Sequence, residues 1–397
     1  MSVNSLITAE EGFPALERLA ASARDELCLS FRIFDPRAKL RDTALQEMGL
    51  ETWADLIALV SRRGVRLRLL LADFDPLFTK DLHRKAWAAA SGFADVVQGD
   101  SQILCAPHGQ TAGTLWRLAL RGRLRRMLHS LRDEDPTRLT PVQRAVLDAG
   151  PVLRPVTVHQ KFAVADARAC IIGGLDVDER RYDTNAHDRP APQTWHDVSL
   201  HVEDDDFAGA LRAHFAECWN AALDCGAASL ADRAGPIDVS IKPQSRPDLR
   251  LIRTFSSPCP GAARLAPLTR VDDHETTFLR LFSQAKRHIH IETQFLRHKP
   301  VVDALYSAAS NAPDLQLVIV LPAAPERVLF GGDASTDAKH GHWLQFKALQ
   351  RLKNGFGDRI ALLTPARDVP ADTDDPDVFD ADPIYVHAKV ALIDDTY

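Results

Sequence analysis

The stretch His159-Gln160-Lys161-Phe162-Ala163-Val164-Ala165-Asp166 has a second copy near the end of the chain, His387-Ala388-Lys389-Val390-Ala391-Leu392-Ile393-Asp394. Both copies read His-x-Lys-x4-Asp, and each places its His and Lys at the head of a short apolar run. Chance would give far less than one such match in a chain of this composition. The repetition therefore predicts two related halves that contribute to one chemistry.

The segments around the two motifs alternate between strand-like and helix-like patterns. Strand, helix and strand in that order indicate a parallel sheet with helical crossovers. A hairpin is expected around 166–168, with Gly173-Gly174 ending its second strand. Strands are predicted over 27–34, 65–71, 195–202, 288–295 and 315–321, and helices over 13–24, 51–63, 206–223, 273–286 and 300–310.

This order predicts two α/β halves, the second repeating the plan of the first. The first half is expected over 1–225. A linker rich in Ala, Ser, Pro and Gly follows over 226–249, and the second half covers 250–397. A length of 397 residues suits this division.

Composition narrows the class of protein. Net charge is -6, with 48 basic against 54 acidic residues, so we expect no nucleic-acid partner. The six cysteines form no CxxC pair, which favours reduced thiols over a zinc site or disulfides. The N-terminus resembles no signal peptide and no run of apolar residues suits a membrane span. We expect a cytoplasmic protein without an obligate protein partner, peripheral membrane association or signal-independent export remaining open.

Each motif is expected to form a β-strand. Residues two apart on a strand share a face, so His159 and Lys161 project together, as do His387 and Lys389. Each Asp is seven residues beyond its His. That odd offset directs it to the opposite face, which suits an orienting carboxylate better than one that touches substrate.

Two imidazoles and two ammonium groups from two halves suit a phosphodiester substrate. The lysines would offset the phosphate charge and the charge that develops in the transition state. One imidazole could attack phosphorus while the other protonates the leaving oxygen and then activates water or an alcohol. The scheme requires no metal and no cofactor. The residues alone leave open which histidine plays which part.

Further segments make the chain resemble the phospholipase D superfamily, in particular its plant and animal members. They are Gly173-Gly174-Leu175-Asp176, Arg180 to Thr184, Trp195 to Val198, Arg253 to Ser256, Ile291 to Phe295 and Ile384 to His387.

The resemblance implies a duplicated α/β fold of two halves with mixed sheets, related by a pseudo-twofold axis, with the active site at their interface. It also implies a phosphohistidine on His159 and a general acid at His387. It implies phosphate binding by Lys161 and Lys389, and support of the motifs by Asp166 and Asp394. Glu292 and Gln294 stand where the family has Glu-Asn-Gln-Tyr, with Thr293 replacing Asn. With Asp176 and His196 they are expected near the substrate, although a structural role for His196 and a core position for Glu292 are the alternatives.

Members of that family continue past the second motif into a further strand, whereas this sequence stops at Tyr397. Without that strand, residues 385–394 would form a sheet edge with less support for His387. We therefore expect reduced or absent activity from residues 1–397 alone.

Two other stretches carry alternatives. Residues 115–132 place Trp116, Leu120, Leu124 and further apolar residues on one helical face among many arginines. This helix would either lie on an anionic membrane or dock its apolar face on the core. The Asp-rich stretch 365–383 reads as a solvated loop without EF-hand spacing.

The leading hypothesis is a phospholipase D-type phosphodiesterase that hydrolyses or transphosphatidylates glycerophospholipids. A cardiolipin-synthase-like phosphatidyltransferase, a nuclease of the same superfamily and an inactive lipid-binding scaffold are the alternatives. Head-group preference is expected to depend on loops such as 323–345 and 365–383.

Overall fold

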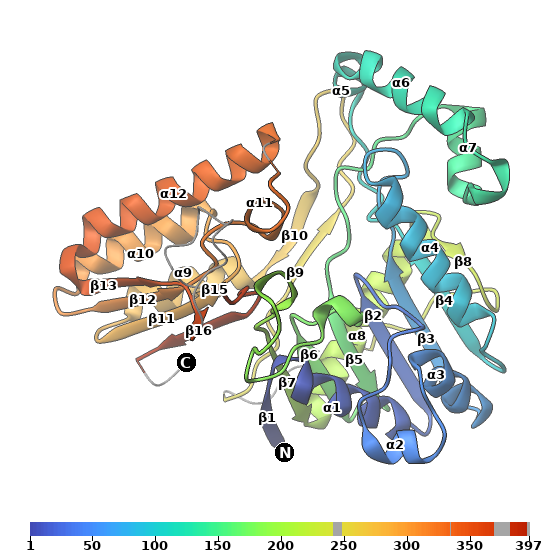
Figure 1. Cartoon of the computed structure of the whole chain (residues 1–397), viewed down its shortest axis with the longest axis horizontal. Helices are drawn as coiled ribbons and strands as arrows, with labels where there is room; N and C mark the ends of the chain where they lie inside the picture. The colour runs from blue at the N-terminus through green and yellow to red at the C-terminus, as the bar shows by residue number, and fades with distance from the viewer. Residues whose placement is uncertain (241–247, 334, 369–381, 395–397) are drawn as a thin grey trace.

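The computed structural model describes residues 1–240, 248–333, 335–368 and 382–394. Two separate sheets dominate it, one in each half of the chain (Figure 1). Strands of the first half are β1 (Ser2–Ile7), β2 (Glu26–Phe31), β3 (Arg66–Ala72), β4 (Ser101–Ala106), β5 (Lys161–Ala165), β6 (Ala169–Gly173), β7 (Val198–Glu203) and β8 (Ala228–Ser229). Those of the second half are β9 (Thr254–Ser257), β10 (Leu268–Asp272), β11 (His288–Thr293), β12 (Gln316–Val320), β13 (Ile360–Leu363), β14 (Ala366–Arg367), β15 (Asp382–Pro383) and β16 (Lys389–Ile393).

The first sheet has the order β1-β7-β6-β5-β2-β3-β4-β8, and the second has the order β13-β12-β11-β16. In both sheets the motif strand, β5 or β16, runs antiparallel to a central strand whose other neighbour is parallel. Within the described chain, β16 has β11 as its one strand partner and forms an edge of its sheet. β9 pairs with β10, and β14 with β15, as separate ribbons.

The register of the two sheets is the same. Lys161 lies opposite Phe31, the last residue of β2, and Lys389 lies opposite Thr293, the last residue of β11. The parallel pairs also match: the first residues of β2 and β3 pair, as do those of β11 and β12. In both sheets the second residue of the next strand, β3 or β12, then pairs with the first residue of β4 or β13. The duplication predicted from the twin motif is therefore confirmed strand by strand.

The helices of the first half are α1 (Thr8–Ser22), α2 (Thr43–Glu47), α3 (Trp53–Arg62), α4 (Lys80–Ala94), α5 (Thr114–Ala119), α6 (Arg121–Arg132), α7 (Pro141–Ala149) and α8 (Asp205–Asp224). Those of the second half are α9 (Asp273–Gln284), α10 (Lys299–Asn311), α11 (Glu326–Leu329) and α12 (Thr336–Phe356). No helix in the described part of the chain is long and apolar enough to span a bilayer.

Strand alternation decides what each face of a sheet packs against. In β2, Leu27 and Leu29 join the core under α1, α3 and α4, while Cys28 faces α8 on the other side. In β11, Ile289 and Ile291 pack under α9, α10 and α12. The alternate residues of β11 point the other way, and Glu292 there reaches a residue of the first half.

Most predicted elements are present, and three expectations need correction or qualification. The single helix over 115–132 is wrong, because Leu120 separates α5 from α6. The strand expected over 195–202 begins only at Val198. In the acidic stretch 365–383, residues 369–381 lie outside the described chain, so the solvated loop stays a prediction for them. Several elements, including β1 and the long α12, carried no sequence prediction.

Candidate active site

The first motif enters the site just before β5 begins. His159 precedes the strand and Lys161 is its first residue. His387 likewise precedes β16, so neither His is on its strand as predicted. Lys161 Nζ lies 3.4 Å from His159 Nε2 and 3.6 Å from a carboxylate oxygen of Asp176. Lys161 is buried, and burial lowers its pKa while the charge of Asp176 opposes that shift.

Asp176 is itself fixed by the main chain. Its other carboxylate oxygen accepts a hydrogen bond of 2.9 Å from the N–H of Ile33, just beyond β2. The sequence predicted Asp176 near substrate. Its carboxylate contacts the Lys161 side chain and the Ile33 backbone, so it is placed to orient that ammonium group.

The second motif is held by a carboxylate from the first half of the chain. His387 Nδ1 donates to Asp197 Oδ2 over 2.6 Å, and both side chains are buried. The side chain of Lys389 lies 2.8 Å from the same ring nitrogen and also donates to the main-chain carbonyl of His387. With Nδ1 directed at Asp197, the lone pair of the neutral ring is at Nε2.

The main chain reinforces this junction between the halves. The N–H of His196 donates to the carbonyl of Tyr385, and the N–H of His387 donates back to the carbonyl of His196 over 2.8 Å. The Trp195 ring lies 4.6 Å from that of His387 and 5.2 Å from that of Tyr385. The second motif is therefore seated on the segment Trp195-His196-Asp197 of the first half.

Charged groups of both motifs act on the His159 ring. The pKa of His159 is lowered by desolvation and then by the charges of Lys161 and Arg32, with Lys389 and His387 adding to the effect. This shift favours the neutral form of the His159 ring.

Burial lowers the pKa of His387 to about 4, against the opposing effect of Asp197. Burial alone would raise the pKa of Asp197, but the hydrogen bond and charge of His387 keep it below its ordinary value. Both motif histidines are consequently neutral at pH 7 in the free protein, while Asp197 is ionised.

Asp166 lies at the far end of β5 from Lys161, in a turn where its φ is +54°. Its carboxylate accepts hydrogen bonds from the main-chain N–H groups of Arg24 (3.0 Å), Asp25 (2.8 Å) and Glu26 (2.8 Å). It thereby ties the start of β2 to the end of β5.

Asp394 repeats this arrangement in the second half, at a φ of +51°. Its carboxylate accepts from the N–H groups of Lys286 (2.7 Å), Arg287 (2.8 Å) and His288 (3.0 Å). Each Asp thus fixes the two strands that carry its motif, and the described contacts of both are with backbone away from the imidazoles.

The remaining predicted residues form bridges between elements. His196 Nε2 lies 3.3 Å from one oxygen of Glu292, and His290 Nε2 lies 3.1 Å from the other. Gln294 donates to the hydroxyl of Tyr385 over 3.0 Å, directly upstream of the second motif. Glu292 is half-buried rather than in the core, and it joins the two halves.

Three site residues were not singled out from the sequence. Asp197 was quoted within Trp195 to Val198 without a role. Arg32, one residue beyond β2, affects the pKa of His159, and Arg181 stacks over Trp195 at 3.7 Å and affects the pKa of Lys389. A charged residue next to the end of a central strand was the signal available for Arg32.

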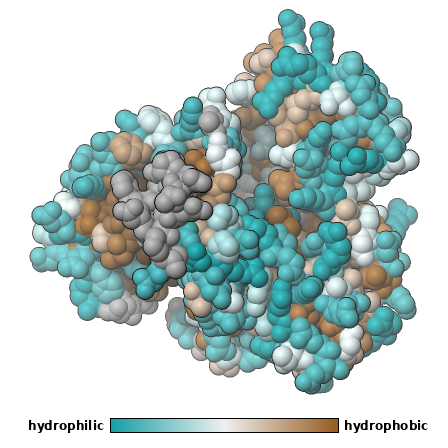
Figure 2. Space-filling model, in the orientation of Figure 1, coloured by the Kyte–Doolittle hydropathy of each residue, from teal (hydrophilic) through white to brown (hydrophobic). Residues whose placement is uncertain are grey.

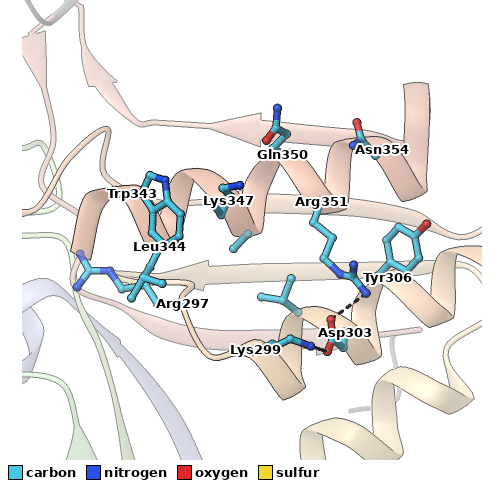
Figure 3. Close-up of a pocket in the computed structure, with 12 residues that line it drawn as sticks. Arg297, Lys299, Asp303, Tyr306, Trp343, Leu344, Lys347, Gln350, Arg351 and Asn354 are labelled. Carbon is cyan, nitrogen blue, oxygen red and sulfur yellow. Dashed lines mark hydrogen bonds and ion pairs between the residues drawn. The ribbon is translucent and has the colours of Figure 1, made fainter. Parts of the chain in front are cut away.

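Within the described residues, no group of three or more His, Cys, Asp or Glu side chains is arranged to hold a metal ion. A separate groove of about 540 Å³ lies between α10 and α12, and no motif residue lines it (Figure 3). There Asp303 pairs with Lys299 and with Arg351, while Trp343 stands at the opposite end beside Arg297.

Comparisons with known proteins place this geometry in context. No family profile and no curated protein matches the sequence. Among solved structures, the phosphatidylserine synthase of Haemophilus influenzae Rd KW20 aligns with 99% of this chain and 76% of its own, at 11% identity and a TM-score of 0.56. Nuc of Salmonella typhimurium, described as a phospholipase D family member, covers 55% of this chain and 94% of its own, at 12% identity and a TM-score of 0.31.

The synthase alignment spans both sheets and both motif strands, whereas Nuc matches only about half of the chain. Identities near 11% carry the arrangement of the backbone and nothing finer. Together with the strand-by-strand duplication, the synthase alignment shows that this chain has the same duplicated α/β fold as that synthase.

Proposed function

We propose that the protein is a phospholipase D-type phosphodiesterase that acts on glycerophospholipids through a phosphohistidine intermediate. The observation that carries this proposal is the hydrogen bond between Asp197 of the first half and His387 of the second, which seats the second His–Lys pair on the half that holds the first. Phosphodiester-acting enzymes among the proteins of similar fold support the same class of reaction.

The first step forms a nitrogen–phosphorus bond. The neutral ring of His159 attacks phosphorus, and the bond from phosphorus to the head-group oxygen breaks. His387, protonated on binding of the anionic substrate, gives its Nε2 proton to that oxygen. The negative charge of the bound phosphodiester favours this protonation, because it opposes burial and the charges of Lys389 and Lys161, which depress the pKa of His387 in the free protein.

The second step reverses the proton transfer. His387 Nε2 takes a proton from water or from an alcohol, whose oxygen attacks phosphorus as the bond to His159 breaks. Lys161, Lys389 and Arg32 stabilise the charge on the phosphoryl oxygens in both steps. Asp197 holds the Nδ1–H tautomer of His387 throughout.

Choline release from phosphatidylcholine tests the proposal directly. We expect turnover by the wild type and a loss of about 10³-fold or more in His159→Ala, because the nucleophile is gone. His129→Ala removes an exposed histidine outside both motifs and serves as the matched control. Equal rates in His159→Ala and wild type would overturn the assignment.

A phosphatidyltransferase is the second candidate, because the alignment over 99% of the chain is with a phosphatidylserine synthase. Adding a primary alcohol such as serine separates the two. A transferase converts the intermediate into a new phosphodiester in preference to phosphatidic acid. DNA cleavage without lipid turnover would identify a nuclease, and lipid binding without turnover would identify a scaffold.

A further inference from the structure

An exposed apolar tip projects from the first half where α5 meets the β9–β10 ribbon (Figure 1). No residue of α5 is buried, although the helix carries Leu115, Trp116 and Leu118. Leu265 is exposed as well, in the segment that joins β9 to β10. We call these four residues the apolar knob.

Specific hydrogen bonds build the knob from segments about 150 residues apart. Leu115 N–H donates to the carbonyl of Ala262 over 3.0 Å, and the Trp116 indole N–H donates to that of Ala263 over 2.9 Å. A side chain at Gly113 would place its Cβ 2.2 Å from the Ala262 carbonyl oxygen, so the approach requires glycine there. The knob is therefore an ordered surface.

The charged side chains of the two segments that carry the knob are all basic. Residues 107–132 and 255–271, which carry it, contain no Asp or Glu, although the whole chain has a net charge of -6. Their arginines are Arg117, Arg121, Arg123, Arg125, Arg126, Arg132, Arg264 and Arg270. Hydrophobic surface appears at the top of Figure 2, where α5 lies, with hydrophilic surface beside it.

The apolar face of α6 is not part of this surface. Leu124 and Leu131 are buried in a small core with Leu77, Leu139 and Val146, which belong to α7 and neighbouring segments. Of the two roles considered for residues 115–132, docking on the protein accounts for α6. The unpartnered apolar surface is on α5.

We propose that the apolar knob inserts into an anionic phospholipid bilayer, with the surrounding arginines at the level of the head groups. Leu and Trp side chains gain by entering the interface, and arginines nearby are attracted to anionic lipid. Neither supporting segment has a carboxylate that the anionic head groups would repel. The proposal rests on the proposed function in one respect, since such docking would bring the protein to its lipid substrate.

Sedimentation with vesicles tests the proposal separately from catalysis. The protein carries His159→Ala so that lipid is not consumed, and the vesicles are phosphatidylcholine alone or phosphatidylcholine with 30% phosphatidylglycerol (about one anionic lipid in three). We expect binding to the anionic vesicles, weakened by salt. Leu118→Asp should lower the affinity roughly tenfold or more, because it replaces inserted apolar surface with a charge that the lipid repels.

Met48→Asp is the matched control. Met48 is 58% exposed against 59% for Leu118, and it follows α2, at the opposite end of Figure 1 from α5. It should bind vesicles as the parent does. Equal binding by the Leu118→Asp protein, an equal loss in Met48→Asp, or equal affinity for neutral vesicles would each overturn the proposal. So would a dimer in solution that Leu118→Asp dissociates, since the knob would then be a self-association surface.

An active enzyme adds a second measurement. With His159 restored, Leu118→Asp should slow turnover of phosphatidylcholine in anionic vesicles and leave turnover of a monomeric short-chain phosphatidylcholine unchanged. If no lipid is turned over while vesicle binding still depends on Leu118, the proposed function fails and the docking surface stands.

Discussion

The substitution Asp197→Asn changes one oxygen to an NH2 group beside His387, and the structure dictates how the ring must respond. Asp197 Oδ1 accepts from the N–H of Val198 over 2.9 Å, while Oδ2 accepts from His387 Nδ1 over 2.6 Å. An asparagine can satisfy Val198 only with its single oxygen. Its NH2 group then faces Nδ1, which must present a lone pair, so the ring proton moves to Nε2.

The expected effects on stability and on activity differ. One buried hydrogen bond replaces another, so the free energy of unfolding should fall by only about 1 kcal/mol, the difference between charged and neutral acceptors. Catalysis should fall by about 10²- to 10⁴-fold, because Nε2 has lost the lone pair that would carry the proton to and from the reacting oxygens.

Nitrogen-15 spectra of labelled histidine report the tautomer, choline release reports the rate, and urea unfolding reports the stability. Asp73→Asn is a suitable control, because Asp73 also contacts a buried imidazole, that of His83, at 2.6 Å but outside the site. It should cost stability without lowering the rate per folded molecule. A variant Asp197→Asn that is fully active, or that is inactive with its Nε2 lone pair retained, would refute the reasoning.

Three further substitutions probe the support around the site. Gly174→Ala would place a Cβ 2.1 Å from Asp197 Oδ1, so we expect a loss of about 1–3 kcal/mol in the free energy of unfolding and a large loss of activity. Gly122→Ala is the control, because a Cβ on Gly122 in α6 would meet open space, and it should be neutral or stabilising. Three backbone N–H groups hold the pKa of Asp166 below its ordinary value despite partial burial, so the ionised carboxylate stabilises the fold above the unfolded pKa of about 4, and this stabilisation is lost as the pH falls through the folded pKa. Asp166→Asn should lower the free energy of unfolding by about 1–3 kcal/mol at pH 7 and weaken its decrease at acid pH, as urea unfolding measures. The rate per folded molecule should be unchanged. The pKa of His387 is lowered to about 4, so below pH 6.5 the unfolded chain binds a proton that the folded chain does not bind. The free energy of unfolding should therefore fall by about 3 kcal/mol between pH 6.5 and 4. His387→Gln should remove this part of the pH dependence from the unfolding curves.

The sequence predicted much of the backbone because its signals are local. Apolar periodicity and turn residues located β2, β3, β5, β6, β11 and β12. Periodicity failed over 115–132, because the same helical face continues through Leu120 and nothing local separates α5 from α6. Only the docking of α6 on α7 and of α5 on the segment around Ala262 distinguishes the two helices.

The sequence by itself determined the repeated pattern: two His–Lys pairs at one spacing, each at the head of a short apolar run, and an Asp whose offset from each pair keeps it away from the ring. The tertiary structure alone decided how the pairs are completed. Asp197 precedes His387 by 190 residues, and their contact exists only because the second sheet packs against the segment Trp195 to Asp197. Side-chain patterns follow the period of a strand or helix, whereas a contact between two sheets depends on how their faces meet, which no short stretch of sequence encodes.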